Sequence, residues 1–207
     1  MSANEHLVTS IEQLEALYVE PYGPAKAKEI DYIHPHYRSM IAASPFLVLC
    51  TSGPGGLDSS PRGDPAGFVQ VLDDKTLLIP DRRGNNRADS LRNIIGDPRV
   101  ALLFLIPGVG ITLRVNGTAV ISVDPALRDR FPVRGTLPRS VIVVTAERVY
   151  FQCPKAVVRS ELWNPDKQTS RKALPSTGTI LADITAGRVG GEQYDRDYPE
   201  RLRTTLY

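Results

Sequence analysis

Residues 99–122 read RVALLFLIPGVGITLRVNGTAVIS and carry the clearest fold signal in the chain. Arg99–Ile106 is apolar at nearly every position, which predicts a strand buried on both faces. Pro107–Gly110 predicts a turn, and Thr112–Ser122 predicts the strand that returns beside the first. The stretch therefore predicts an antiparallel hairpin.

The segments before this hairpin add one helix and more strands. Ala88–Ile95 has helical spacing, with one apolar face formed by Leu91, Ile94 and Ile95. Residues 67–79 predict a second hairpin, because an alternating run is followed by a two-residue turn and another apolar run. Residues 46–51 (FLVLCT) predict a strand, and SGPGG at 52–56 predicts the turn after it.

The segments after the hairpin complete the pattern. Pro125–Phe131 predicts a short helix, Ser140–Tyr150 predicts a long strand, and Ala156–Leu162 predicts a helical turn or two. Regular alternation of strands and helices is absent. Five or six strands at short spacing favour an antiparallel barrel over a doubly wound sheet, so we expect an α+β chain that is mainly β.

The two ends of the chain differ from this middle part. Residues 1–43 predict a helical N-terminal segment, with a capping box at Ser10 and Gln13 and a short helix at Pro35–Ala43. Residues 166–207 are polar and lose periodicity, which predicts a mobile or partner-dependent C-terminal tail. The expected barrel domain is 44–165.

Composition excludes several classes of function. The 25 basic and 23 acidic residues leave a net charge of +2, too small for a dedicated nucleic-acid binder. No apolar run is long enough for a membrane helix, and we expect no membrane partner. Two cysteines without a CxxC spacing, together with no visible secretory signal, predict reduced thiols in the cytoplasm. All three histidines precede residue 37, so we expect no metal site and no side-chain nucleophile.

Pro80–Ser90, PDRRGNNRADS, is the most unusual segment for chemistry. It follows a predicted strand and opens a helix that Asp89 or Ser90 would cap. Guanidinium and amide donors are concentrated in it, at Arg82, Arg83, Asn85, Asn86 and Arg87. Such donors beside a helix N-terminus suit a phosphate or carboxylate. A solvated charged turn is the alternative.

Ser59–Asp64, SSPRGD, is a second candidate. Its polar groups at Ser60, Arg62 and Asp64 would form another phosphate-contacting arm, whereas Pro61 and Gly63 alone favour a simple β-turn. Arg62 and the arginines of Pro80–Ser90 would contact one anion only if the two segments lie side by side.

Cys153–Trp163, CPKAVVRSELW, is the third. Lys155, Arg159 and Trp163 are spaced four apart, so on a helix they share one face, which suits a planar anionic ligand. A surface helix with an interface tryptophan explains the spacing equally well. For Cys153, a structural role is favoured over an activated thiolate beside Lys155.

Together these segments, with DPRVALLFLIPG and TLRVNGTA, resemble the pyridoxamine 5′-phosphate oxidase-related, FMN-binding split-barrel family, and most of all a bacterial branch of it. The resemblance covers about residues 30–165. It implies a six-stranded antiparallel split barrel and a homodimer, with FMN bound in two sites that both subunits build.

The resemblance also implies roles for individual residues. Arg62 is similar to the basic strand residue that holds the FMN phosphate, and Asn86 with Arg87 takes the place of a Ser-Arg-Lys turn. By the same resemblance, Thr112 would supply a polar contact to the flavin ring. Arg83 and Ser90 would support the phosphate contacts, and Lys155, Arg159 and Trp163 would border the ring, from the other subunit in one arrangement.

The chain departs from the oxidases at its C-terminal end. Their Arg-Leu-His-Asp-Arg substrate pattern is absent, and residues 166–207 contain no histidine, so vitamin B6 oxidation is not expected. The function expected from the resemblance is an FMN-dependent oxidoreductase that acts on an unknown small molecule, with NAD(P)H as a candidate reductant. A non-catalytic flavin-storing or ligand-sensing dimer is the alternative. A third option keeps the fold and replaces FMN with haem or a deazaflavin; the few, N-terminal histidines argue slightly against haem.

Overall fold

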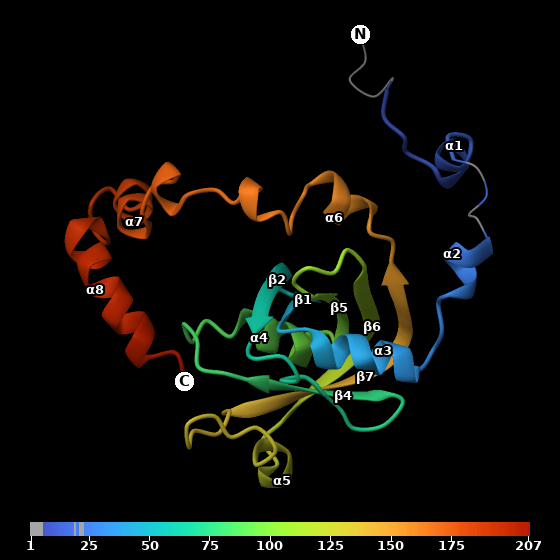
Figure 1. Cartoon of the computed structure of the whole chain (residues 1–207), viewed down its shortest axis with the longest axis horizontal. Helices are drawn as coiled ribbons and strands as arrows, with labels where there is room; N and C mark the ends of the chain where they lie inside the picture. Colours follow the sequence, from blue (N-terminus) through green and yellow to red (C-terminus); the bar gives the residue numbers. More distant parts are fainter. Residues whose placement is uncertain (1–5, 19, 21–22) are drawn as a thin grey trace.

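The computed structural model describes residues 6–18, 20 and 23–207, and its centre is one coiled antiparallel sheet (Figure 1). The seven strands are ordered β2-β1-β5-β6-β7-β4-β3. Their bounds are β1 Phe46–Gly53, β2 Gly56–Gly63, β3 Gln70–Val71, β4 Thr76–Asp81, β5 Arg99–Leu105, β6 Thr112–Ser122 and β7 Ser140–Gln152. The split β-barrel is confirmed. It has seven strands rather than the expected six, β3 being only two residues long.

Short helices surround this sheet. They are α1 Ile11–Glu15, α2 Gly23–Ala27, α3 Pro35–Ala43, α4 Asp89–Gly96, α5 Pro125–Arg128, α6 Lys155–Arg159, α7 Thr177–Ile184 and α8 Gly191–Thr204, with 3-10 turns at Pro165–Lys167 and Arg171–Ala173. α3 packs against β3, β6 and β7, and α4 packs against β1, β2 and β6. In the part of the chain that the structure describes, no helix is long and apolar enough to cross a membrane.

β5 shows how the core is built. Val100, Leu102 and Phe104 are at most 5% exposed and point into the barrel, whereas Ala101 and Leu103 between them are only half-buried. The prediction that both faces of this strand are buried is therefore wrong for the single chain. A barrel strand has one inner and one outer face, and no described element covers the outer face of β5.

β6 and β7 form the longest ladder of the sheet and contain an irregularity. The register shifts between Asn116 and Gly117, where the two strands come very close. A Cβ atom at Gly117 would collide with the carbonyl oxygen of Thr145. Glycine is therefore required here by the close approach of two backbones.

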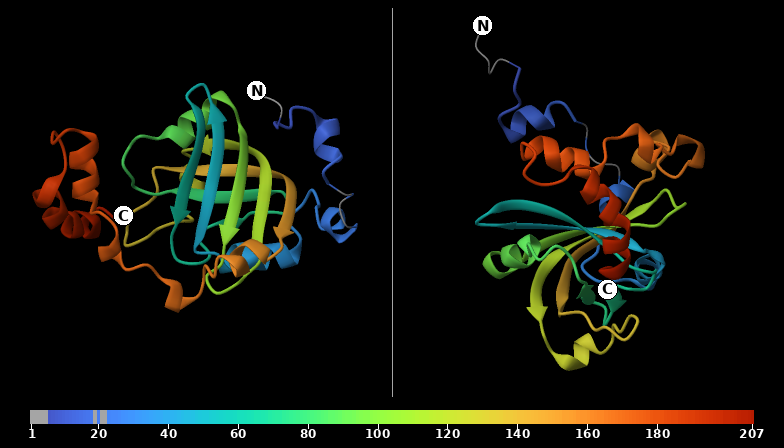
Figure 2. Two further views of the ribbon diagram at one scale, coloured as in Figure 1. Left: turned by 90° about the horizontal axis from the view of Figure 1, so that it is seen from above. Right: turned by 90° about the vertical axis from the view of Figure 1, so that its left-hand side faces the viewer.

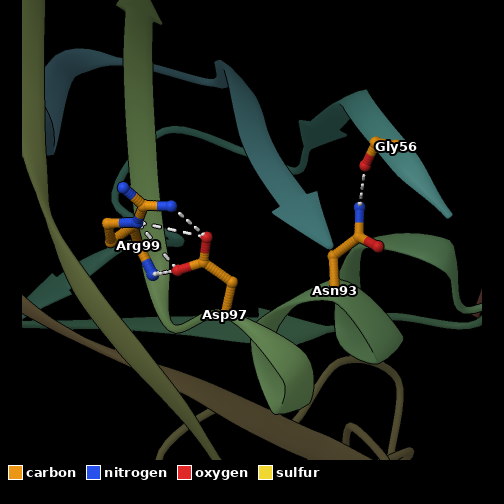
Figure 3. Close-up of polar contacts among 4 residues, drawn as sticks. All are labelled: Gly56, Asn93, Asp97 and Arg99. Carbon is orange, nitrogen blue, oxygen red and sulfur yellow. Dashed lines mark hydrogen bonds and ion pairs between the residues drawn. The ribbon is translucent and has the colours of Figure 1, made fainter. Parts of the chain in front are cut away.

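α4 is held by a polar contact as well as an apolar one. Ile94 is buried, but Ile95 is 80% exposed, so the predicted apolar face is only partly right. The buried position is occupied instead by Asn93, whose amide donates to Gly56 O at 3.2 Å (Figure 3). The same amide donates to Thr51 Oγ1, also at 3.2 Å. This contact anchors α4 to the β1–β2 hairpin.

The N-terminal segment begins with α1, as predicted. Ser10 Oγ accepts a hydrogen bond from the Gln13 N–H at 3.2 Å, while Gln13 Oε1 accepts from the Thr9 N–H at 2.8 Å. The hydrogen bond expected at Ser10 Oγ is thus confirmed. The reciprocal bond to Gln13 Oε1 comes from the N–H of Thr9 instead of that of Ser10. The apolar residues of α1 are all exposed. The predicted division at residue 43 stays a prediction.

The C-terminal segment has more regular structure than its sequence predicts. α7 and α8 pack on each other and lie to one side of the barrel (Figure 2). Asp195 ties them together by accepting from the Gly178 N–H at 2.7 Å and from the Ser176 hydroxyl. After α8 the chain returns, and Tyr207 reaches the barrel.

Candidate functional site

Two ion pairs join strands that are not neighbours in the sheet. Arg62 Nη1 on β2 lies 2.7 Å from Asp81 Oδ1 on β4. Asp64, directly after β2, lies 2.7 Å from Arg82 Nε, directly after β4. All four side chains are at most 18% exposed. Because β2 is one edge strand and β4 lies near the other edge, the pairs close the split of the barrel.

The SSPRGD segment is a strand and not the turn that Pro61 and Gly63 alone favoured. Ser60 and Arg62 pair with Leu49 and Leu47, both fully buried, and therefore share their inward face. An edge strand tolerates Pro61, because its missing N–H is not needed there. Asp58, Ser60 and Arg62 are half-buried, while Ser59, Pro61 and Gly63 between them are exposed, which is the alternation of a strand.

Ser90 joins this cluster. Its hydroxyl donates to Asp58 Oδ2 at 2.5 Å and accepts from Arg62 Nη2 at 3.3 Å. It therefore does not cap α4, and neither does Asp89: the N-cap is Ala88, with φ +56° and no side-chain cap. Arg62 Nε is buried and has no hydrogen-bond partner within the described residues. Arg62 Nε is therefore an unpaired donor in a network whose other polar groups are hydrogen-bonded.

Asn86 and Arg87 do not join Arg62. Asn86 has φ +62°, and its Oδ1 accepts from Arg139 Nη1 at 2.9 Å. Arg87 is 74% exposed and pairs with Asp89 at 2.7 Å, which raises the pKa of its guanidinium. The predicted convergence of these residues with Arg62 is thus observed for Ser90 alone.

A cavity of about 210 Å³, here called the arginine cavity, lies beside the Asp64–Arg82 ion pair. Its charged and aromatic lining consists of Arg82, Arg83, Arg139 and Tyr207. None of the ion pairs found among the described residues involves Arg83 or Arg139. The cavity therefore carries unbalanced positive charge, which attracts an anion.

Tyr207 closes one side of the arginine cavity. Its hydroxyl donates to Asp64 Oδ1 at 2.7 Å, and this hydrogen bond to a buried carboxylate raises the pKa of the phenol. The guanidinium carbons of Arg82 and Arg134 lie 5.9 and 5.4 Å from the ring centre. Sequence reasoning missed both Tyr207 and Arg139, and no local pattern marks either of them.

The residues expected at the flavin ring lie elsewhere. Thr112 is buried at the start of β6, opposite Gln152 at the end of β7. The arginine cavity lies at the start of β7, next to Ser140. The 13 residues of β7 between them span about 40 Å along the strand. A single chain therefore keeps Thr112 far from the arginine cavity.

The third segment does not form one helical face. α6 ends at Arg159, and the left-handed backbone of Glu161, with φ +49°, turns the chain before Trp163. Lys155 and Arg159 are exposed, while Trp163 is half-buried and donates from Nε1 to Val109 O at 2.9 Å. The spacing argument fails because the helix is too short to carry it.

Cys153 lies directly before α6. A hydrogen bond from the Lys155 backbone N–H is the main cause that lowers the pKa of its thiol, and the charges of Lys155 and Lys28 contribute. Within the described residues, Cys153 belongs to no group of three or more His, Cys, Asp or Glu side chains that could hold a metal ion.

The chain is similar to one known family of proteins. The family model described as pyridoxamine 5′-phosphate oxidase matches residues 33–153, more than half of the chain. No protein with a curated function matches. Among solved structures, HupZ of Group A Streptococcus is 18% identical over 58% of this chain and 94% of its own, with a TM-score of 0.49.

Two further solved structures are similar in the same region. General Stress Protein 26 of Bacillus anthracis is 20% identical, over 55% of this chain and 88% of its own, with a TM-score of 0.39. An FMN-binding protein of Syntrophomonas wolfei is 15% identical, over 55% and 82%, with a TM-score of 0.43.

Proposed function

The chain belongs to the pyridoxamine 5′-phosphate oxidase family, and from this premise we propose that it is a homodimeric flavoprotein that binds FMN and acts as an oxidoreductase on a small molecule. The observation that carries the proposal is the arginine cavity, with its uncompensated charge at Arg83 and Arg139.

The residues present fit the phosphate end of FMN. A dianionic phosphate needs several charge-assisted donors, and Arg83 and Arg139 offer them in the arginine cavity. A volume of about 210 Å³ suits a phosphate group better than a ring system. Asp64 holds the guanidinium group of Arg82, which also lines the cavity, in a fixed orientation, so that this wall would need little reorganisation on binding.

FMN, when bound, supplies the electron transfer, and the protein's part is to bind, orient and shield it. Arg83 and Arg139 would hold the phosphate, and Asn86 would orient Arg139 through the 2.9 Å hydrogen bond. Thr112 would donate its hydroxyl to the ring, with Lys155, Arg159 and Trp163 at the ring's border.

A second copy is required for this arrangement, because Thr112 and the arginine cavity lie at opposite ends of β7. The outer face of β1 and β5 offers an apolar surface for it: Phe46 is 37% exposed, and Val48, Ala101 and Leu103 are half-buried. An interface on the order of 2,000 Å² is expected. Sedimentation of the FMN-loaded protein at micromolar concentration should give a dimer, and a monomer would contradict this part of the proposal.

The alternative is a non-catalytic flavin-storing or ligand-sensing dimer. One observation favours it: Tyr207 lines the arginine cavity and ties the C-terminal segment to Asp64 beside it. A site lined by this segment leaves less room for a second substrate, which suits storage better than turnover.

Titration tests flavin binding. FMN should bind with micromolar or better affinity, and riboflavin about a hundredfold more weakly, because it lacks the groups that pair with two arginines. Arg139→Gln should weaken FMN and leave riboflavin unchanged, whereas the control Arg188→Gln, on the C-terminal segment, should change neither. Equal affinities for FMN and riboflavin would contradict the phosphate assignment.

Reduction of the bound FMN then distinguishes an oxidoreductase from a non-catalytic flavin-binding dimer. If the protein is an oxidoreductase, the visible absorption of the FMN-loaded protein should bleach with NADH or NADPH and recover when an acceptor is added. A spectrum that neither nucleotide changes, in a protein that binds FMN tightly, would favour the storage or sensing dimer.

A further inference from the structure

A second cavity lies at the other end of β7 from the arginine cavity. Its volume is about 430 Å³, within the range of small-molecule sites. The N-terminal segment and α3 form one side of it, and the ends of β6 and β7 form the other. We call it the aromatic cavity, and its key lining residues are Lys28, Tyr32, His34, His36, Tyr37 and Phe151.

The walls of this cavity are fixed by hydrogen bonds. Ile30 pairs with Val149 of β7 through both backbone groups, at 3.1 and 2.7 Å. The Tyr37 hydroxyl donates to Lys28 O at 2.7 Å, and burial raises the pKa of this phenol. The segment that carries Lys28 is therefore tied both to the sheet and to α3, and the cavity is preformed.

The chemistry of the lining is aromatic with one cation. Lys28 Nζ lies 4.8 Å from the centre of the Phe151 ring. No carboxylate is among the lining residues, and among the described residues Lys28 takes part in no ion pair. A cation held over an aromatic ring and lacking a counter-charge favours a ligand that brings both a ring and a negative charge.

The two histidines extend the aromatic surface to the rim. The ring centres of His34 and His36 are 4.8 Å apart, and those of His34 and Tyr37 are 6.3 Å apart. His34 Nδ1 accepts from the His36 N–H at 3.2 Å, which fixes the orientation of the His34 ring. A planar ligand can therefore contact ring faces on several sides.

We propose that the aromatic cavity binds a planar aromatic carboxylic acid, with its ring against Phe151 and Tyr37 and its carboxylate paired with Lys28. A phosphorylated ligand fits less well, because the lining contains no arginine and a single lysine. The proposal does not depend on flavin binding. The two cavities are separated by the length of β7, so one small molecule cannot occupy both in the same chain.

The test uses flavin-free full-length protein and fluorescent 2-naphthoate as the probe, followed by anisotropy. The probe should bind saturably, and about tenfold more tightly than its uncharged analogue 2-naphthalenemethanol, which keeps the ring and lacks the charge. Cyclohexanecarboxylate, which keeps the charge and lacks the planar ring, should compete poorly.

Variants locate the binding. Lys28→Met should remove the preference for the acid over the alcohol, and Phe151→Leu should weaken both. The control Lys172→Met, at an exposed lysine outside the cavity, should change neither. A thermal unfolding curve for each variant verifies that it is folded. If Phe151→Leu is unfolded, the test rests on whether Lys28→Met loses the preference for the acid over the alcohol.

Four results would overturn the proposal. Two concern the aromatic cavity itself: the absence of saturable binding up to millimolar probe, and unchanged affinity in Lys28→Met. The other two, loss of binding in Arg139→Gln and displacement by inorganic phosphate, would place the probe in the arginine cavity. Failure of FMN to bind would leave this result unaffected, so the two proposals fail separately.

Discussion

Arg62 on β2 and Asp81 on β4 form an ion pair of 2.7 Å between two strands that share no hydrogen-bonded ladder. The parallel pair of Asp64 and Arg82 lies beside it. Both pairs hold the split of the barrel closed, and the second also positions the Arg82 guanidinium group in the wall of the arginine cavity. Fold and candidate site thus depend on the same contacts.

We expect Arg62→Met to destabilise the flavin-free protein by about 3 kcal/mol, because it leaves Asp81 as an uncompensated charge in a largely buried place. Urea unfolding measures the change. The control Arg87→Met breaks the exposed pair with Asp89 and should leave the midpoint nearly unchanged. Equal midpoints for Arg62→Met and the wild type would show that the pair does not stabilise the barrel.

Gly117→Ala should destabilise the protein by about 2–4 kcal/mol, since the new methyl group meets the Thr145 carbonyl oxygen in the β6–β7 bulge and the backbone must shift. Gly55→Ala is the matched control, because its new Cβ meets open space. Thermal unfolding of both variants compares them directly. A Gly117→Ala protein as stable as Gly55→Ala would mean that the bulge is looser than described.

Asp97 should give the protein an acid-sensitive contact. Hydrogen bonds from the Arg99 guanidinium are the main cause that lowers the pKa of Asp97 from 3.8 to about 2 (Figure 3). A depressed folded-state pKa stabilises the fold above pH 4, and this contribution disappears as the pH falls towards 2. The difference in melting temperature between the wild type and Asp97→Asn should therefore be largest near pH 6 and vanish near pH 2. A difference that stays constant between these values would contradict the assignment.

Trp163 tests the ring end of the proposed flavin site. It is the only tryptophan in the sequence, and it is held by its hydrogen bond to Val109 O. If a second copy brings the flavin ring into stacking range, FMN should quench most of the emission, and its removal should restore it. Emission that is the same with and without FMN would remove Trp163, and with it the third segment, from the site.

Much of the barrel was predictable because its signals are local. The range Thr112–Ser122 was predicted with the bounds that the structure shows, and α3 at Pro35–Ala43 likewise. The site was less predictable. Lys155 and Trp163 are spaced like one helical face, but sequence spacing cannot tell that Glu161 ends the helix with a left-handed turn.

The C-terminal segment illustrates the same limit. Polar sequence without periodicity predicted no regular structure, yet α7 and α8 form a pair. Asp195 supplies the reason, because its carboxylate holds the start of α7 from a position in α8. Such a contact between two helices replaces the apolar face that periodicity detects.

Most of the strands, the helices α3 to α6 and the family follow from the sequence, because they depend on apolar alternation, turn residues and segments that each lie within about twenty positions. Which charges are free depends on contacts made only in the folded chain. Arg62 and Arg82 are equally basic in the sequence, but folding pairs Arg62 with Asp81 and Arg82 with Asp64. Folding also brings the Tyr207 hydroxyl to the Asp64 carboxylate, from which it is 143 positions away in the sequence. Whether a guanidinium can hold a ligand depends on the partner that the coiled sheet places beside it, and that partner lies far away along the chain.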